Sequence, residues 1–356
     1  MTLSPQQQIV LDSFQSNHVS VDSCAGSGKT TTLIACVSAV PPELRSDVIA
    51  VAFGRRNADE LSARLPMWAV ANTFHSFGKD AIQSALGRKA AKVNKNKIWE
   101  LLRSIDCNPF ALGKAEQKSK LKEHSDAVRL VSLGKASLCM PSQYVSSLEL
   151  EDDYSELIRQ LADQAYNQSK LNPDAGIDFD DMIWYPYEFP EVADALPSAS
   201  ALFVDECQDL SGAQTFMVKK MLSGGRLASF GDEHQAIYGF RGADGTALYE
   251  LADHVNATKL RLSVSFRCPR AVTTYAQQFV PDITADPSAP DGIVETVDAI
   301  DYRWWANRYP TVICRFNAPL VDIALQLISR NIRAQIRGRS VGDGLLKLLD
   351  KLQTEH

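Results

Sequence analysis

Residues 23–31 read Ser-Cys-Ala-Gly-Ser-Gly-Lys-Thr-Thr and follow a short run of β type, Val19–Asp22. A glycine-rich turn that leads from a strand into a helix and ends in Gly-Lys-Thr is typical of a loop that binds nucleotide phosphates. Backbone N–H groups can close around the phosphate oxygens, and the N-terminus of the next helix adds partial positive charge. The first position holds Ser23, where glycine is usual, so the loop alone also fits an ordinary turn at a helix start.

The loop predicts a set of phosphate and metal contacts. We expect Lys29 to reach the β- and γ-phosphates of a nucleoside triphosphate and the Thr30 hydroxyl to bind Mg²⁺. The remaining expected nucleotide-binding residues of the loop are Ala25, Gly26, Ser27, Gly28 and Thr31.

A second motif supports this chemistry. The apolar run Ser200–Val204 is of strand type and leads into Asp205-Glu206-Cys207-Gln208-Asp209. Carboxylates at the C-terminal end of a buried parallel strand hold a magnesium–phosphate complex in this type of fold. We expect Asp205 to bind the metal, directly or through water, and Glu206 to orient and deprotonate the attacking water. The alternative is an acidic first turn of a helix, where carboxylates are favoured in any case.

A third segment, Gly231–Ala243, follows the strand-like run Leu227–Phe230 and contains Asp232-Glu233-His234-Gln235. With it, the chain resembles superfamily 1A DNA helicases of the UvrD/Rep/PcrA type, in particular their N-terminal part. The other matching segments occur in the family's order: Leu3–Gln7, Val51–Leu61, Thr73–Phe77, Asp178–Met182, Asp205–Asp209 and Leu262–Pro269. The resemblance implies an α/β fold of the P-loop NTPase class, with a RecA-like parallel-sheet lobe, an inserted helical subdomain and a partial second RecA-like lobe.

The resemblance also implies roles for single residues. Gln7 would read the adenine edge, which suits an amide with one donor and one acceptor group. Phe266 would stack on the adenine, and Gln235 and Arg267 would act on the γ-phosphate as catalytic residues beside Lys29 and Glu206. DNA contacts are implied for Phe53, Thr73, Phe74, His75, Phe240 and Arg241. A phenylalanine beside a strand is usually part of the core, so Phe53 and Phe74 are also core candidates.

Composition narrows the protein class. The chain has 356 residues, of which 45% are hydrophobic, which allows two or three domains and a sizeable core. No apolar run approaches the roughly 20 residues that span a bilayer, and the first residues show no signal-peptide pattern. The seven cysteines are scattered without a Cys-x-x-Cys pair, which predicts reduced thiols rather than a zinc or iron–sulfur site. His75 and His234 have no second ligand at suitable spacing either. We therefore expect a cytoplasmic protein without a membrane partner.

The charge is unevenly distributed. The net charge is −6, yet twelve Lys and Arg face five Asp and Glu between Arg88 and Lys135. A basic stretch of this kind favours sequence-independent contacts with nucleic-acid phosphates, although a solvated helical face has the same composition. In the family this position corresponds to a subdomain beside the duplex.

Alternating β-like and helical segments predict a doubly covered parallel sheet over 1–86, with strands at Val19–Val21, Val48–Ala52 and Ala69–Asn72. Helical spacing, at Lys97–Arg103 and Tyr154–Ala162, predicts the inserted basic subdomain over 87–170. The sheet lobe is expected to resume over 171–255. A partial second lobe is expected over 256–356, with strands at Lys259–Leu262, Ile293–Val297 and Pro310–Cys314 and a helix at Pro319–Arg330.

Nothing after Arg267 resembles the family's motifs V and VI. Three functions therefore stay open. The first is an ATP- and Mg²⁺-dependent helicase or translocase that moves 3′→5′ on single-stranded DNA and acts at junctions with duplex. The second is a DNA-stimulated ATPase without unwinding, which a second chain could complete with motifs V and VI. The third is a module that binds ATP and DNA without hydrolysis.

Overall fold

The computed structural model describes residues 3–87, 89, 91–171, 176–236, 245–296 and 311–336. The chain forms two compact units, Met1–Ile293 and Val294–His356. Within the described residues, no helix combines the length and the apolar character needed to cross a membrane.

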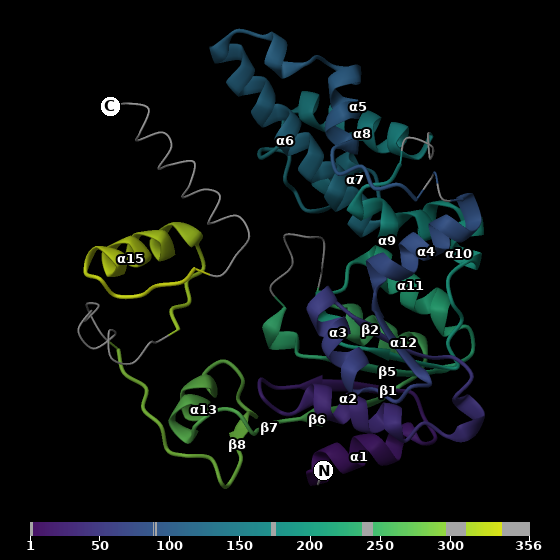
Figure 1. Cartoon of the computed structure of the whole chain (residues 1–356), viewed down its shortest axis with the longest axis vertical. Helices are drawn as coiled ribbons and strands as arrows, with labels where there is room; N and C mark the ends of the chain where they lie inside the picture. Colours follow the sequence, from purple (N-terminus) through teal and green to yellow (C-terminus); the bar gives the residue numbers. More distant parts are fainter. Residues whose placement is uncertain are drawn as a thin grey trace. The chain divides into compact units, whose positions relative to one another are not determined.

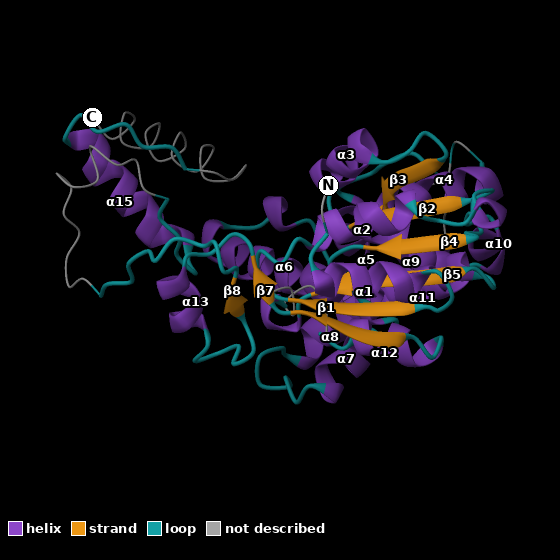
Figure 2. Ribbon diagram, turned by 90° about the horizontal axis from the view of Figure 1, so that it is seen from below, coloured by secondary structure: helices purple, strands orange, loops and turns teal. Residues whose placement is uncertain are grey.

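The larger unit is built on a six-stranded sheet in the order β3-β2-β4-β5-β1-β6 (Figure 2). The strands are β1 (Val19–Ser23), β2 (Val48–Ala52), β3 (Ala69–Thr73), β4 (Ala201–Val204), β5 (Arg226–Gly231) and β6 (Thr258–Leu262). All of their pairings are parallel. The carboxyl ends of these strands therefore lie at the same edge of the sheet, where the predicted nucleotide motifs follow β1, β4 and β5.

Helices cover both faces of the sheet, as a parallel sheet requires. One face packs against α1 (Pro5–Phe14), α2 (Lys29–Ser38) and α3 (Arg55–Arg64). The other packs against α4 (Phe74–Leu86), α9 (Phe179–Glu188), α11 (Gly212–Leu222) and α12 (Ala247–His254). Alternate strand residues serve the two cores: Phe203 of β4 faces α1, whereas Leu202 and Val204 face the α4 side. The short helix α10 (Pro190–Asp194) follows α9.

In the described residues of the predicted insertion, the regular secondary structure is helical, apart from one isolated β-bridge that joins Val93 to Ile177. Its helices are α5 (Lys97–Ile105), α6 (Lys114–Ser137), α7 (Pro141–Ser147) and α8 (Glu156–Leu171). They gather at one end of the larger unit, away from the sheet (Figure 1). Both helices predicted in this region are present.

Two lysines of the basic stretch are buried in this group rather than exposed. The Lys135 ammonium lies 3.0 Å from Asp178 and 2.7 Å from Asp181, and its side chain is fully buried. Lys97 lies 2.7 Å from Asp181 and also donates to the Ser169 carbonyl and the Tyr185 hydroxyl. Although burial raises the pKa of Asp178, the charge of Lys135 and the hydrogen bonds to this carboxylate lower it overall. The network joins α5, α6 and α9, so these two charges are not available to DNA phosphates.

The strand predicted at Lys259–Leu262 belongs to the first sheet, not to a second lobe. It is part of β6, which pairs with β1 so that Asp22 lies opposite Arg261. An apolar alternation predicts a strand but not the sheet that the strand joins, because the pairing partner is distant in sequence.

Beyond β6 the described residues hold little sheet. Strands β7 (Val264–Ser265) and β8 (Thr284–Ala285) form a separate parallel pair, and α13 (Arg270–Ala276) lies between them in the sequence. The strands predicted at Ile293–Val297 and Pro310–Cys314 are wrong where the structure describes them, over 293–296 and 311–314, and the other predicted residues lie outside the described part. In the smaller unit, α15 (Asn317–Ser329) matches the predicted helix. The predicted domain boundaries stay a prediction.

Replacing Lys135 with Ala is expected to lower the free energy of unfolding by about 3–5 kcal/mol, because Asp178 and Asp181 would keep buried charges without their main partner. Urea denaturation followed by circular dichroism at neutral pH measures the loss. Lys170→Ala is the matched control, because Lys170 pairs with Glu188 at 2.9 Å in a more exposed setting and should contribute less than about 1 kcal/mol. Equal losses in the two variants would contradict the prediction.

Candidate nucleotide-binding site

The predicted phosphate loop connects β1 to α2. Gly26 and Gly28 have left-handed φ angles of 79° and 80°, and Gly28 is the N-cap of α2. Only glycine adopts this backbone without steric cost, which explains the two glycines. The unusual Ser23 also has a local reason: its hydroxyl donates to the Gly231 carbonyl at 2.6 Å and ties the start of the loop to the end of β5.

The loop offers a buried hydroxyl to a ligand. The Ser27 side chain is buried, and its Oγ has no hydrogen-bond partner in the described part of the chain. A buried hydroxyl without a partner is costly. Phosphate oxygens would accept from it, so the residues of the loop fit a bound phosphate chain.

The acidic residues after β4 lie next to the loop lysine. Lys29 Nζ donates to Glu206 Oε2 and lies 3.6 Å from Asp205 Oδ1. Gln208 Nε2 donates to the same Glu206 oxygen at 2.9 Å. Glu206 itself has a left-handed φ of 55°, which is strained for a residue with a side chain and is typical of functional positions. Two segments that are distant in sequence therefore meet in one charged cluster.

The two carboxyl groups differ in their electrostatics. Burial raises the pKa of Asp205, and Lys29 offsets this only in part. Burial also raises the pKa of Glu206, but the charge of Lys29 and the hydrogen bonds from Lys29 and Gln208 outweigh it, so the pKa of Glu206 is lowered. Asp205 and the half-buried Thr30 offer the oxygen ligands that Mg²⁺ prefers, so the donor set fits this ion.

The segment that carries Arg267 is docked on the phosphate loop. Cys24 N–H donates to the Leu262 carbonyl at 2.8 Å, and Phe266 N–H donates to the Gly26 carbonyl at 2.9 Å. The Ser265 hydroxyl donates to the Ala25 carbonyl at 2.8 Å. These contacts place the exposed side chains of Phe266 and Arg267 beside the loop within one compact unit.

Two of the three glutamines of α1 contact the phosphate loop and the segment docked on it: Gln7 contacts the loop, and Gln6 contacts Ser263. Gln7 is buried; its Oε1 accepts from Ser4 N–H at 3.0 Å and its Nε2 donates to the Ser27 carbonyl at 3.1 Å. Each amide atom has one further hydrogen-bonding position, so the implied contact with adenine stays a prediction. Gln6 forms paired bonds with Ser263, through its amide nitrogen to the hydroxyl and from the backbone N–H to its oxygen. The sequence did not indicate this role for Gln6.

Gln235 belongs to a hydrogen-bonded loop after β5. Its Nε2 donates to Asp232 Oδ2 at 2.5 Å, and His234 N–H donates to Asp232 Oδ1 at 3.1 Å. Asp232 N–H donates to Gln208 Oε1 at 3.0 Å, and Gln208 contacts Glu206. Gln235 is thus connected to the proposed catalytic carboxylate through Asp232, by its side chain and its backbone N–H, and through the side chain of Gln208. His234 lies 3.4 Å from Glu233, in line with a local role inside its motif.

The predicted DNA-contacting residues differ in how far the structure buries them. Phe74 is only 1% exposed and lies in the core, so its prediction as a base platform is wrong: it packs inward as the first residue of α4. Thr73 is buried, and its hydroxyl accepts from Ser76 N–H as the N-cap of α4. Phe53 and His75 are half-buried. Phe240 and Arg241 lie outside the described residues.

Phe179, which the sequence did not indicate as a site residue, lies beside His75. Its ring is 49% exposed, lies edge-on 6.4 Å from His75, and has the Lys95 ammonium 5.8 Å from its centre. An exposed aromatic ring beside cationic and polar side chains suits stacking on a nucleic-acid base. In the sequence, Phe179 is marked only as the first residue of α9, directly after the capping residue Asp178.

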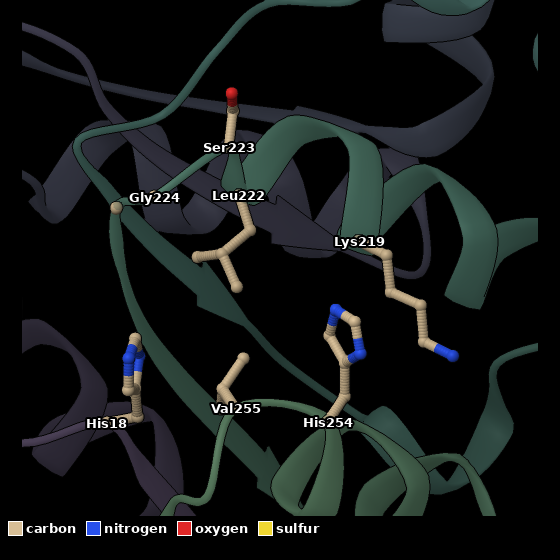
Figure 3. Close-up of a pocket in the computed structure, with 8 residues that line it drawn as sticks. His18, Lys219, Leu222, Ser223, Gly224, His254 and Val255 are labelled. Atoms are coloured by element: carbon tan, nitrogen blue, oxygen red, sulfur yellow. The ribbon is translucent and has the colours of Figure 1, made fainter.

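Two other features lie apart from the loop. A cavity of 260 Å³, lined by His18, Lys219 and His254 among others, lies where the chain enters β1, β5 and β6 (Figure 3). That is the edge opposite the phosphate loop. Asp106, Cys107 and His124 bring three potential metal ligands together, which the scattered cysteines did not predict. However, the Lys120 ammonium lies 3.1 Å from the same Asp106 oxygen that His124 contacts, where it would oppose a cation.

A phosphate loop after β1 and paired carboxylates after β4, on a six-stranded parallel sheet, define a RecA-like domain of the P-loop NTPase class. A family model described as the UvrD/REP helicase N-terminal domain matches residues 3–256, and the chain belongs to this family.

Several named DNA helicases are similar to this chain, in line with the family match. The F-box DNA helicase protein 1 of Schizosaccharomyces pombe is 25% identical over 276 residues, which cover 72% of this chain and 30% of that protein. The ATP-dependent DNA helicase PcrA of Bacillus subtilis is 26% identical, over 72% of this chain and 36% of its own length. The ATP-dependent DNA helicase Rep of Buchnera aphidicola is 25% identical, over 68% and 39%. The chain thus spans about a third of the length of these relatives.

Gly26→Ala is expected to weaken nucleotide binding at least about tenfold. A left-handed φ costs a residue with a side chain about 1–2 kcal/mol, and the new Cβ would lie 2.6 Å from Arg267 Cβ. Titration with a fluorescent ATP analogue measures the dissociation constant. Gly54→Ala is the control, because no atom lies within 4 Å of a Cβ added there and its φ is −128°. A normal affinity in the Gly26 variant would contradict the observed docking of residues 262–267.

Proposed function

We propose that this chain is an ATP-hydrolysing motor domain that couples Mg²⁺-dependent ATP hydrolysis to 3′→5′ movement on single-stranded DNA. The observation that carries the proposal is the meeting of Lys29, Glu206 and the Arg267 segment around one glycine-rich loop. The names of the relatives, which are ATP-dependent DNA helicases, support the same conclusion.

The chemistry follows from the charges in the cluster. A γ-phosphate carries more negative charge than Glu206, so a bound ATP draws the Lys29 ammonium away from this carboxylate. The freed carboxylate then orients a water molecule for in-line attack and accepts its proton. The new bond forms between the water oxygen and the γ-phosphorus, and the bond from the γ-phosphorus to the β,γ-bridging oxygen breaks. Mg²⁺, held by Thr30 and Asp205, would neutralise phosphate charge when bound.

Arg267 would stabilise the charge that develops on the γ-phosphate. Its segment contacts the loop through Ser265 and Phe266, so the guanidinium starts close to the phosphates. Phe266, exposed beside Gly26, would stack on the base. Gln235 would respond to the γ-phosphate, because its motif connects to Glu206 through Asp232 and Gln208.

Single-stranded DNA would bind across the larger unit through Phe179, Lys95 and His75, with further contacts at Phe53. The exposed lysines of α6 would attract the backbone near a junction with duplex, without base specificity. All seven cysteines are unpaired, which supports a reducing compartment such as the cytoplasm.

A DNA-stimulated ATPase without unwinding is the second candidate. It is favoured by one observation: beyond Leu262, the described residues form no second sheet larger than the β7–β8 pair. A module without hydrolysis is less favoured, because Lys29 contacts both Asp205 and Glu206 beside the glycine-rich loop.

Steady-state ATP hydrolysis, with and without single-stranded DNA, tests the proposal. We expect a rate that DNA stimulates and that Lys29→Ala abolishes. Glu206→Gln should keep nucleotide affinity but lower kcat by about 10²–10⁴-fold, since only the base is lost. A Glu206→Gln variant with the wild-type rate would show that the base has been assigned wrongly. A helicase assay on a tailed duplex then separates the motor from the simple ATPase.

Phe179→Ala is expected to weaken binding of single-stranded DNA by about 1–3 kcal/mol, the range measured for base–aromatic stacking. Fluorescence anisotropy with a labelled oligothymidylate at fixed salt measures the change. Phe110→Ala is a matched control, because Phe110 is 59% exposed and lies 5.2 Å from the Arg103 guanidinium in the helical insertion. If both variants lose affinity equally, the effect does not come from a stacking site at Phe179.

A further inference from the structure

Arg261 contacts two carboxylates, and neither the family match nor the proposed chemistry gives it a role. It lies in β6 opposite Asp22, which directly precedes Ser23 at the end of β1. Its Nη1 donates to Asp22 Oδ2. Its Nε and Nη2 donate to the two oxygens of Asp282, at 2.7 and 2.9 Å. The guanidinium therefore bridges two carboxylates in a forked geometry that lysine cannot reproduce.

On one side, this bridge leads to the hydrolysis site. The other oxygen of Asp22 accepts from Glu233 N–H at 3.4 Å, at the start of the motif that contains Gln235. Next to Glu233, Asp232 is bonded to Gln208, which donates to Glu206. The contacts are consecutive, so a shift of the Asp232–Gln235 loop changes the geometry at Asp22.

On the other side, the bridge leads to Arg267. Asp282 precedes β8, and β8 pairs with β7 so that Ser265 lies opposite Ala285. The backbone N–H of Asp286 donates to the Ser265 carbonyl at 3.0 Å. Ser265 also holds the Ala25 carbonyl of the phosphate loop through its hydroxyl. Asp282 is therefore attached to the segment that presents Arg267.

We propose that Arg261 is a positioning residue that holds the Arg267 segment in register with the hydrolysis site, through its bridge from Asp22 to Asp282. When the γ-phosphate is bound or lost, the Asp232–Gln235 loop adjusts, and the bridge carries this adjustment to residues 263–267. This inference rests on the proposed ATPase function and adds a residue to it.

The experiment compares Arg261→Gln, Arg261→Lys and Asp282→Asn with the wild type in steady-state hydrolysis and in nucleotide titration. We expect kcat to fall about tenfold in each variant, because a small displacement of a catalytic group slows the reaction strongly. Nucleotide affinity and the thermal unfolding midpoint should stay unchanged. A variant that combines Arg261→Gln with Asp282→Asn should be no slower than either single variant, since each substitution breaks the same bridge.

Arg270→Gln and Asp291→Asn are the matched controls. Arg270 pairs with Asp291 at 2.6 Å in the same part of the chain, and no described contact connects this pair to Glu206. Their kcat should equal that of the wild type. If the control pair lowers kcat as much as Arg261→Gln does, the effect is a general loosening of the segment, and the inference is wrong.

Three further outcomes are informative. Wild-type kcat in the Arg261 variants, with Lys29→Ala inactive, would refute the role of Arg261 and leave the proposed function standing. A parallel loss of affinity and thermal stability would show that Arg261 has only a structural role, and the inference would be wrong.

If the wild type does not hydrolyse ATP at all, the proposed function fails, and hydrogen exchange still tests the bridge. In that experiment a non-hydrolysable ATP analogue should protect amides of residues 263–267 in the wild type but not in Arg261→Gln. Equal protection would refute the inference.

Discussion

Strand β1 lies between β5 and β6, and the parallel direction of the three strands fixes where the segments after their carboxyl ends lie. Their carboxyl ends must lie together, so the phosphate loop after β1 is bounded by the turn after β5 and by the segment after β6. The contacts of Ser23 with Gly231 and of Cys24 with Leu262 are the direct result. Because Gly26 has no side chain, the Arg267 backbone can lie directly against the loop. The arrangement of the site is therefore a property of the sheet order as much as of the motifs.

Pairing of buried or partly buried charges is the second feature on which the structure depends, and it occurs in two lysine–carboxylate clusters. Lys29 contacts both Asp205 and Glu206, and its charge lowers the pKa of Glu206, so the carboxylate that we propose as the base stays ionised. In the helical insertion, Lys97 and Lys135 are paired with Asp178 and Asp181 in the same way, but deeper. The first cluster is open to a ligand that competes for the lysine. The second has no such access and joins the insertion to α9.

Both clusters bear on how a motor of this family can work. The segment that carries Arg267 contacts the phosphate loop inside the larger unit, so the proposed hydrolysis site and Arg267 belong to one compact unit. The hydrogen bonds from Glu206 to Asp232 and from Asp22 to Asp282 are the path through which we propose that this unit responds to the nucleotide. The exposed ring of Phe179 lies on α9, next to the buried network. A change in the position of α9 therefore affects both the proposed DNA contact and the insertion.

The sequence by itself determined the phosphate loop, the carboxylate pair and the strands that carry them, because local glycine, lysine and apolar patterns specify these elements over a few residues. It also predicted the helical insertion from its periodicity. Only the tertiary structure decided that residues 258–262 complete the first sheet, that Phe74 is core while Phe179 is exposed, and that two lysines of the basic stretch are buried. These outcomes depend on which distant segments pair and pack, and neither strand pairing nor burial is encoded in a local pattern. The Arg261 bridge belongs to the same class, since Asp22 and Asp282 are neighbours only after the sheet has formed.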